Sequence, residues 1–117
     1  MINVLTIMND ELAKMNIPYT FDTWDKDVEL PQFIGEIQEE PTLDEDGKSE
    51  YSFILTGYAT NYKYLFEVGE KLKEKYKNSV CVMCGVVIKY DKLITIDNGI
   101  DDLKQVQITL KIKEWSV

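Results

Sequence analysis

The chain has 117 residues, of which 44% are hydrophobic and 29% charged, proportions typical of one soluble globular domain spanning residues 1–117. Its formal net charge is −8, all 13 basic residues are lysine, and histidine is absent. The composition therefore excludes catalytic dyads and metal sites built on histidine, and the negative charge disfavours binding to nucleic-acid phosphates and anionic membrane surfaces.

The residues Met1–Met15 place apolar side chains at helical spacing, which predicts an amphipathic helix. We expect Pro18 to end it, because proline disfavours helical backbone in the residue that precedes it. Aromatic and polar residues alternate over Tyr19–Trp24, a pattern typical of a short strand. No basic region leads an apolar segment here, and no apolar run approaches the ~18–20 residues of a membrane helix, so we expect neither a signal peptide nor a membrane span.

A long hairpin is predicted between residues 32 and 58. The segments Gln32–Glu39 and Glu50–Tyr58 read as strands, and Asp46–Gly47 between them is a dipeptide that favours hairpin turns. Aspartate and glutamate surround this dipeptide. We therefore expect a β-hairpin with an acidic tip.

The segment 61–77 carries a helical pattern, with Thr60 or Asn61 suited to its N-cap. Lysines gather in its last turns, where positive charge complements the helix dipole. We expect one apolar stripe to face the core, made of Tyr62, Leu65, Phe66, Gly69, Leu72 and Tyr76.

The C-terminal third reads as strands. Val80–Tyr90 is apolar on both faces, which predicts a central strand, and Leu93–Ile96 either extends it or pairs with it. In Lys104–Glu114 apolar and polar residues alternate, and we expect Val106, Ile108, Leu110 and Ile112 to face inward. The whole order predicts an α+β domain: a mostly antiparallel sheet with about two helices packed on one face and a long acidic hairpin.

The two cysteines, Cys81 and Cys84, form a CxxC motif, which suggests a zinc half-site or a redox dithiol. Zinc needs four ligands, and a second Cys pair or histidines are absent from the sequence. Redox dithiols lie at a helix N-terminus, whereas this motif falls in a predicted strand. We expect two ordinary strand thiols, with Cys84 the more buried, and no metal or other cofactor.

The acidic run Asp44–Gly47 faintly resembles a calcium-binding loop. Aligning its glycine with the loop glycine puts Thr42 at the first ligand position and Phe53 at the closing glutamate position, and neither fits. A hydrolase with two carboxylates is not formally excluded, but nothing marks one pair. We therefore interpret this run as a solvated turn and expect no enzymatic activity.

The net charge is concentrated in residues 22–50. This segment holds 11 acidic residues against Lys26 and Lys48, a net of −9, while the rest of the chain carries 10 acidic and 11 basic residues, a net of +1. Three interpretations remain open: a solvated loop and hairpin that aids solubility, an acidic surface that faces DNA without holding it, and an acidic surface that occupies the DNA-binding groove of a partner.

The order of elements resembles that of a known family. A helix is followed by Pro18–Phe21, a proline-led strand at Pro31–Glu36, a strand ending near Gly57–Tyr58, helix 61–77, and a closing strand that ends in Trp115. In this order the chain is similar to the small tail-terminator and tail-completion proteins, also called head–tail joining proteins, of long-tailed bacteriophages and prophages. The likeness covers most of the chain but includes no diagnostic motif.

The resemblance implies a virion structural protein that forms an oligomeric ring at the head-proximal end of the tail. Its partners would be further copies of itself and other phage tail or head-completion proteins, and DNA would pass through the ring without specific binding. It would reside in the bacterial cytoplasm before assembly and in the virion afterwards. The hairpin tip would contact the next subunit or the tail tube, through Asp44, Glu45, Asp46 and Gly47.

The same acidic segment supports an alternative from another class. The chain could be a small intracellular antagonist, a DNA mimic or an inhibitor of a basic host protein. Such a protein would bind one basic partner tightly and in a salt-sensitive way.

Overall fold

The computed structural model describes residues 2–21, 30–40, 48–83 and 85–115. These residues form two helices and six strands, which confirms the predicted α+β class. In chain order the elements are α1 (Ile2–Lys14), β1 (Tyr19–Phe21), β2 (Gln32–Glu40), β3 (Lys48–Ala59), α2 (Tyr62–Tyr76), β4 (Val80–Met83), β5 (Val86–Ile96) and β6 (Lys104–Trp115).

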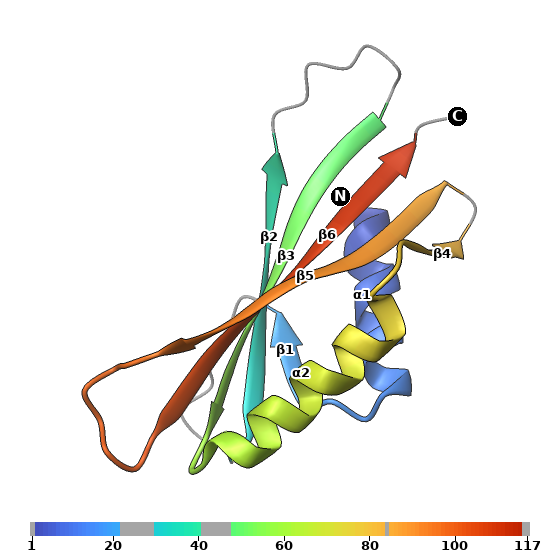
Figure 1. The fold of residues 1–117 in the computed structure, drawn as a ribbon. Helices are drawn as coiled ribbons and strands as arrows, with labels where there is room; N and C mark the ends of the chain where they lie inside the picture. The colour runs from blue at the N-terminus through green and yellow to red at the C-terminus, as the bar shows by residue number, and fades with distance from the viewer. Residues whose placement is uncertain (1, 22–29, 41–47, 84, 116–117) are drawn as a thin grey trace.

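The six strands make one twisted sheet in the order β1-β2-β3-β6-β5-β4 (Figure 1). Every neighbouring pair is antiparallel except β1 and β2, which run parallel. The predicted mostly antiparallel sheet is therefore confirmed. The long strands β3 and β6 form its centre, and the short strands β1 and β4 lie at its two edges.

Both helices pack on the same face of the sheet, as predicted. Asn3 of α1 donates a hydrogen bond to Glu114, and Gly69 of α2 lies against Leu93 and Ile108. Glu114 and Ile108 are an even number of residues apart on β6, so their side chains leave the sheet on one side. The helices also touch each other, because Tyr76 of α2 is hydrogen-bonded to α1.

The helix α1 ends in a Schellman motif. The Ile17 N–H donates to the Leu12 carbonyl and the Asn16 N–H to the Ala13 carbonyl, both at 3.1 Å, and Asn16 has a φ of 55°. Asparagine tolerates this left-handed conformation better than most residues. The helix therefore ends at Lys14 through this turn, before the point at which Pro18 was expected to stop it.

The helix α2 begins after Asn61, as expected, but the Asn61 side chain makes no capping hydrogen bond. The predicted apolar stripe is wrong at one position, because Phe66 is 41% exposed and stacks on Tyr62 with ring centroids 5.2 Å apart. Val68 is buried in its place. The buried side of the helix consists of Leu65, Val68, Gly69, Leu72 and Tyr76.

The predicted single strand over Val80–Tyr90 is wrong. The chain forms β4, reverses, and returns as β5, which continues to Ile96. Gly85 has a φ of 85° at this reversal, a conformation that glycine adopts without a steric penalty. The apolar character of both faces therefore reflects two paired strands, and β4 lies at an edge of the sheet rather than at its centre.

The sheet contributes a row of apolar side chains to the core beneath the helices. The predicted inward residues of β6 are all buried, and their neighbours Phe53 and Leu55 on β3 are fully buried. Two glycines make room for aromatic rings: a Cβ at Gly57 would lie 2.4 Å from the Phe33 ring, and one at Gly35 would lie 2.5 Å from the Tyr19 ring. The aromatic rings therefore pack closely against the backbone at these two glycines, as side chains do in protein interiors.

Candidate functional site

The predicted interface residues Asp44, Glu45, Asp46 and Gly47 lie outside the described residues. The strands on either side of them are described and pair as expected, in a register that runs from Gln32 opposite Tyr58 to Glu40 opposite Glu50. The predicted hairpin is therefore confirmed in its strands, while the role of its tip stays a prediction.

The CxxC motif falls where the chain leaves β4. Cys81 is exposed on this edge strand, and Cys84 lies outside the described residues. The motif was expected within one continuous strand, and that expectation is wrong because β4 ends at Met83. Among the described residues, no group of three or more His, Cys, Asp or Glu side chains could hold a metal ion.

One carboxylate is buried between the helices. Glu11 is only 7% exposed, and its Oε1 accepts a hydrogen bond of 2.6 Å from the Tyr76 hydroxyl. The Lys75 ammonium lies 3.3 Å from the same oxygen and the Lys14 ammonium 3.5 Å from Oε2. Burial raises the pKa of Glu11, but these hydrogen bonds and lysine charges outweigh it and hold the pKa below the ordinary 4.5. The partners therefore keep this carboxylate ionised, and it ties α1 to α2.

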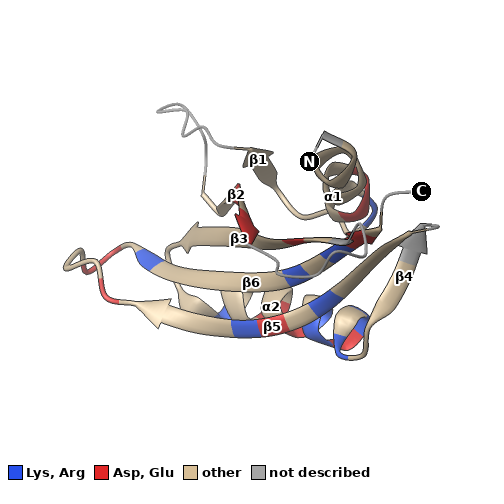
Figure 2. Ribbon diagram, turned by 90° about the horizontal axis from the view of Figure 1, so that it is seen from above, with Lys and Arg blue, Asp and Glu red and all other residues tan. Residues whose placement is uncertain are grey.

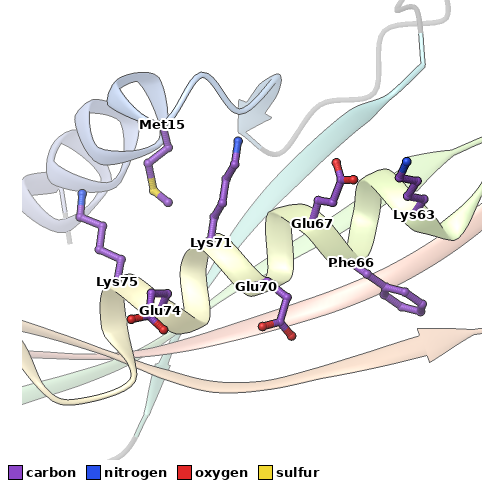
Figure 3. A pocket seen from close by; sticks show the side chains of 8 residues that line it. All are labelled: Met15, Lys63, Phe66, Glu67, Glu70, Lys71, Glu74 and Lys75. Atoms are coloured by element: carbon purple, nitrogen blue, oxygen red, sulfur yellow. The ribbon is translucent and has the colours of Figure 1, made fainter.

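A shallow hollow of about 940 Å³ lies along the outer side of α2, next to Met15, the residue that follows α1 (Figure 3). Three lysines and three glutamates of α2 line it, so its formal charge is zero. Phe66 and Met15 supply its apolar surface. No functional role was predicted from the sequence for the residues of this hollow, and Phe66 among them was expected to face the core.

The opposite face of the sheet carries no helix among the described residues. We call it the helix-free face, and it consists of the alternate side chains of β2, β3, β6 and β5 that point away from α1 and α2. The register fixes one row across it, in which residues of the four strands lie side by side: Glu36, Ile54, Thr109 and Lys92. A glutamate therefore begins this row and a lysine ends it.

The charged residues of the whole sheet are divided in the same way, with acidic residues concentrated on one side and basic residues on the other (Figure 2). The strands β2 and β3 contain four glutamates and one lysine, a formal charge of −3. The strands β6 and β5 contain five lysines, one glutamate and one aspartate, a formal charge of +3. One half of the sheet is acidic and the other basic, so the domain has a charge dipole across its strands.

A polar bridge joins the two halves on the helix-free face. The Ser52 hydroxyl donates to Glu40 Oε1 at 2.6 Å and accepts a hydrogen bond from Lys111 Nζ at 2.8 Å. Lys111 also lies 3.8 Å from Glu40, and Ser52 is only 3% exposed. The bridge crosses β2, β3 and β6 and fixes their charged side chains relative to one another.

No protein-family model and no curated protein sequence matches the chain. Within the described residues, neither helix is long and apolar enough to cross a membrane. The feature that stands out is the charge-divided sheet. Sequence reasoning located its acidic half and missed its basic half, although the two-residue spacing of Lys111 and Lys113 already indicated one lysine-bearing strand face.

Proposed function

We propose that the chain is a structural subunit of a long-tailed phage or prophage particle, a tail terminator or tail-completion protein. It acts by assembling into a ring at the head-proximal end of the tail. Its partners are further copies of itself and other tail or head-completion proteins, and DNA passes through the ring without specific binding. Before assembly it resides in the bacterial cytoplasm.

The observation that carries this proposal is the charge-divided sheet. A domain with an acidic side and a basic side attracts a second copy in one orientation, with the acidic side of one facing the basic side of the next. Repeating such a contact generates a ring or a filament, because each copy uses two different surfaces. This is the kind of surface that a ring-forming subunit needs.

The acidic segments 22–29 and 41–47 support the part of the proposal that concerns DNA. Each carries a formal charge of −3. Segment 41–47 directly follows β2, the most acidic strand, and two residues separate segment 22–29 from the start of β2. Negative charge that faces a DNA channel repels phosphates and prevents binding. We expect these segments, including the tip Asp44–Gly47, to face either the channel or the neighbouring subunit.

The alternative, an acidic antagonist that mimics DNA, is less well supported. A mimic needs a continuous acidic surface, whereas the sheet that carries the acidic strand β2 also carries Lys89, Lys92, Lys111 and Lys113. These lysines would repel the basic groove that a DNA mimic occupies. The alternative predicts salt-sensitive capture of one basic host protein by the purified chain.

Deletion of the gene from the phage or prophage that carries it tests the proposed function. We expect electron micrographs of the lysate to contain heads without joined tails or tails of irregular length, and supply of the gene in trans to restore joined particles. The control is complementation with a frameshifted copy of the gene. Normal particles in the deletion strain would refute the proposed function.

A further inference from the structure

The two sides of the sheet have stepped outlines that fit each other. At one side, β1 pairs only with Phe33–Gly35 of β2. At the other side, β4 pairs only with Val86–Ile88 of β5. In the part of the chain that the structure describes, no strand pairs with the outer side of Glu36–Glu40 or of Lys89–Ile96. We call these segments the acidic edge and the basic edge.

The short strands β1 and β4 cover opposite ends of the sheet. Through the register of the sheet, Gly35, where β1 pairs, lies level with Leu93 on the basic edge. Ile88, where β4 pairs, lies level with Glu39 on the acidic edge. When a second copy is set beside the first in the same orientation, β1 of one copy and β4 of the other therefore fill different ends of the same gap.

The directions of the strands agree with this arrangement. Because β2, β3, β6 and β5 alternate in direction, β2 and β5 are antiparallel to each other. In copies of the same orientation, β1 of one copy would therefore lie antiparallel beside Leu93–Thr95 of β5 in the next copy. The strand β4 of that next copy would lie parallel beside Glu39–Glu40 of β2 in the first. The unpaired N–H and C=O groups of Leu93–Thr95 and of Glu39–Glu40 would gain partners there, as they do within a sheet.

The charges permit this junction and oppose the others. Glu36 and Glu39 are exposed on the acidic edge, which has no lysine, and Lys89 and Lys92 are exposed on the basic edge, with Asp91 between them. Two acidic edges or two basic edges would place like charges together, which is destabilising across strands. At the junction of unlike edges, Glu36 lies level with Lys92.

We propose that the chain assembles head to tail, with the acidic edge of β2 in one copy facing the basic edge of β5 in the next and with β1 and β4 in the column between them. The partner is a second copy of this chain. The inference deepens the proposed function, because it names the surfaces through which the ring forms. A head-to-tail contact leaves one edge of each kind open until the ring closes, so assembly continues beyond a dimer.

Charge exchange between the edges tests the proposal, with native mass spectrometry and light scattering of the purified full chain as the readouts. One variant carries Glu36→Lys and Glu39→Lys, a second carries Lys89→Glu and Lys92→Glu, and a third combines all four substitutions. The control carries Glu67→Lys and Glu70→Lys on exposed positions of α2, which changes the net charge as much as the first variant does. Circular dichroism checks that each variant is folded.

We expect the wild type, the control and the fourfold variant to form the same oligomer, larger than a dimer, at low ionic strength. Each twofold edge variant alone should be monomeric, because its two edges then carry like charge. An equimolar mixture of the two edge variants should assemble again, since unlike edges then meet. Oligomers by either edge variant alone, or no assembly by the mixture, would overturn the proposal.

A wild type that stays monomeric at its highest soluble concentration, or that stops at a dimer, would also overturn it. The outcome is separable from that of the gene deletion. Assembly through the edges together with normal particles in the deletion strain would keep the edge contact and remove the tail function. A monomeric chain whose deletion abolishes joined tails would do the reverse.

Discussion

The Tyr76 hydroxyl donates a hydrogen bond of 2.6 Å to Glu11 Oε1, and this bond between residues 65 positions apart joins the two helices. Both side chains are buried, and the carboxylate stays ionised because lysines on each helix also face it. This contact fixes α2 against α1. It therefore keeps both helices together on one face of the sheet. The other face carries no helix among the described residues.

Replacing Tyr76 with phenylalanine should destabilise the fold by about 1.5–3 kcal/mol, because a buried carboxylate loses a donor and nothing replaces it. The free energy of unfolding, measured with urea, checks this expectation. A loss below about 0.5 kcal/mol would mean that the bond does not hold the helices together.

Tyr19 offers a matched control. Its hydroxyl is buried but has no hydrogen-bond partner among the residues that the structure describes, and burial raises its pKa to about 12. Replacing Tyr19 with phenylalanine should therefore leave the free energy of unfolding unchanged within about 0.5 kcal/mol or increase it, since no bond is lost and a polar atom leaves the interior. A loss equal to that of Tyr76→Phe would show that the hydroxyl has a partner.

The stability of the wild type should depend on pH through Glu11. Its pKa in the folded chain lies below the ordinary 4.5, so the ionised carboxylate stabilises the fold above pH 4.5 and this stabilisation is lost as the pH falls through the folded value. The difference in unfolding free energy between wild type and Glu11→Gln should be largest at neutral pH and shrink towards acid. A constant difference from neutral to acidic pH would contradict the assignment.

Two glycine substitutions should differ sharply. Gly57→Ala puts a methyl group 2.4 Å from the ring of Phe33, which is fully buried and cannot move aside, so we expect a loss of about 1–3 kcal/mol. Gly69→Ala meets only the end of the Leu93 side chain and gains helix propensity, so its effect should stay within about 1 kcal/mol. Thermal unfolding of both variants tests this, and equal losses would contradict the packing described.

The bridge between the acidic and basic halves should be energetically coupled. Ser52→Ala removes both hydrogen bonds of the bridge and should cost about 1–2 kcal/mol. In a double-mutant cycle, Ser52→Ala and Lys111→Ala should deviate from additivity by at least about 0.5 kcal/mol. The distant pair of Ser52→Ala and Lys63→Ala should be additive, and additivity in both cycles would exclude a working bridge.

Much of the fold was predictable because its signals are local. The alternation in β6 and the helical spacing in α2 each show up within one element, and the structure confirms both. The reversal at Gly85 was missed because two short apolar strands that pair with each other look like one longer buried strand. Phe66 was assigned to the core although the register of α2 over Leu93 buries Val68 instead, and that register is a tertiary property.

The candidate site was only half predictable. The acidic concentration over residues 22–50 is visible in the sequence. The basic half comes from β5 and β6, which are neighbours in the sheet, and only the strand order brings their lysines together. Strand order depends on pairings between distant segments, and neither composition nor periodicity reports it.

The most direct measurement of the proposed tail function is quantitative mass spectrometry of phage particles purified from an induced culture of the strain that carries the gene. The account predicts that the chain is present in a small, fixed number of copies per particle, as one ring requires, and that it is lost when tails are removed. Absence of the chain from particles, despite strong expression in the induced cells, would contradict the account and direct attention to a basic host partner.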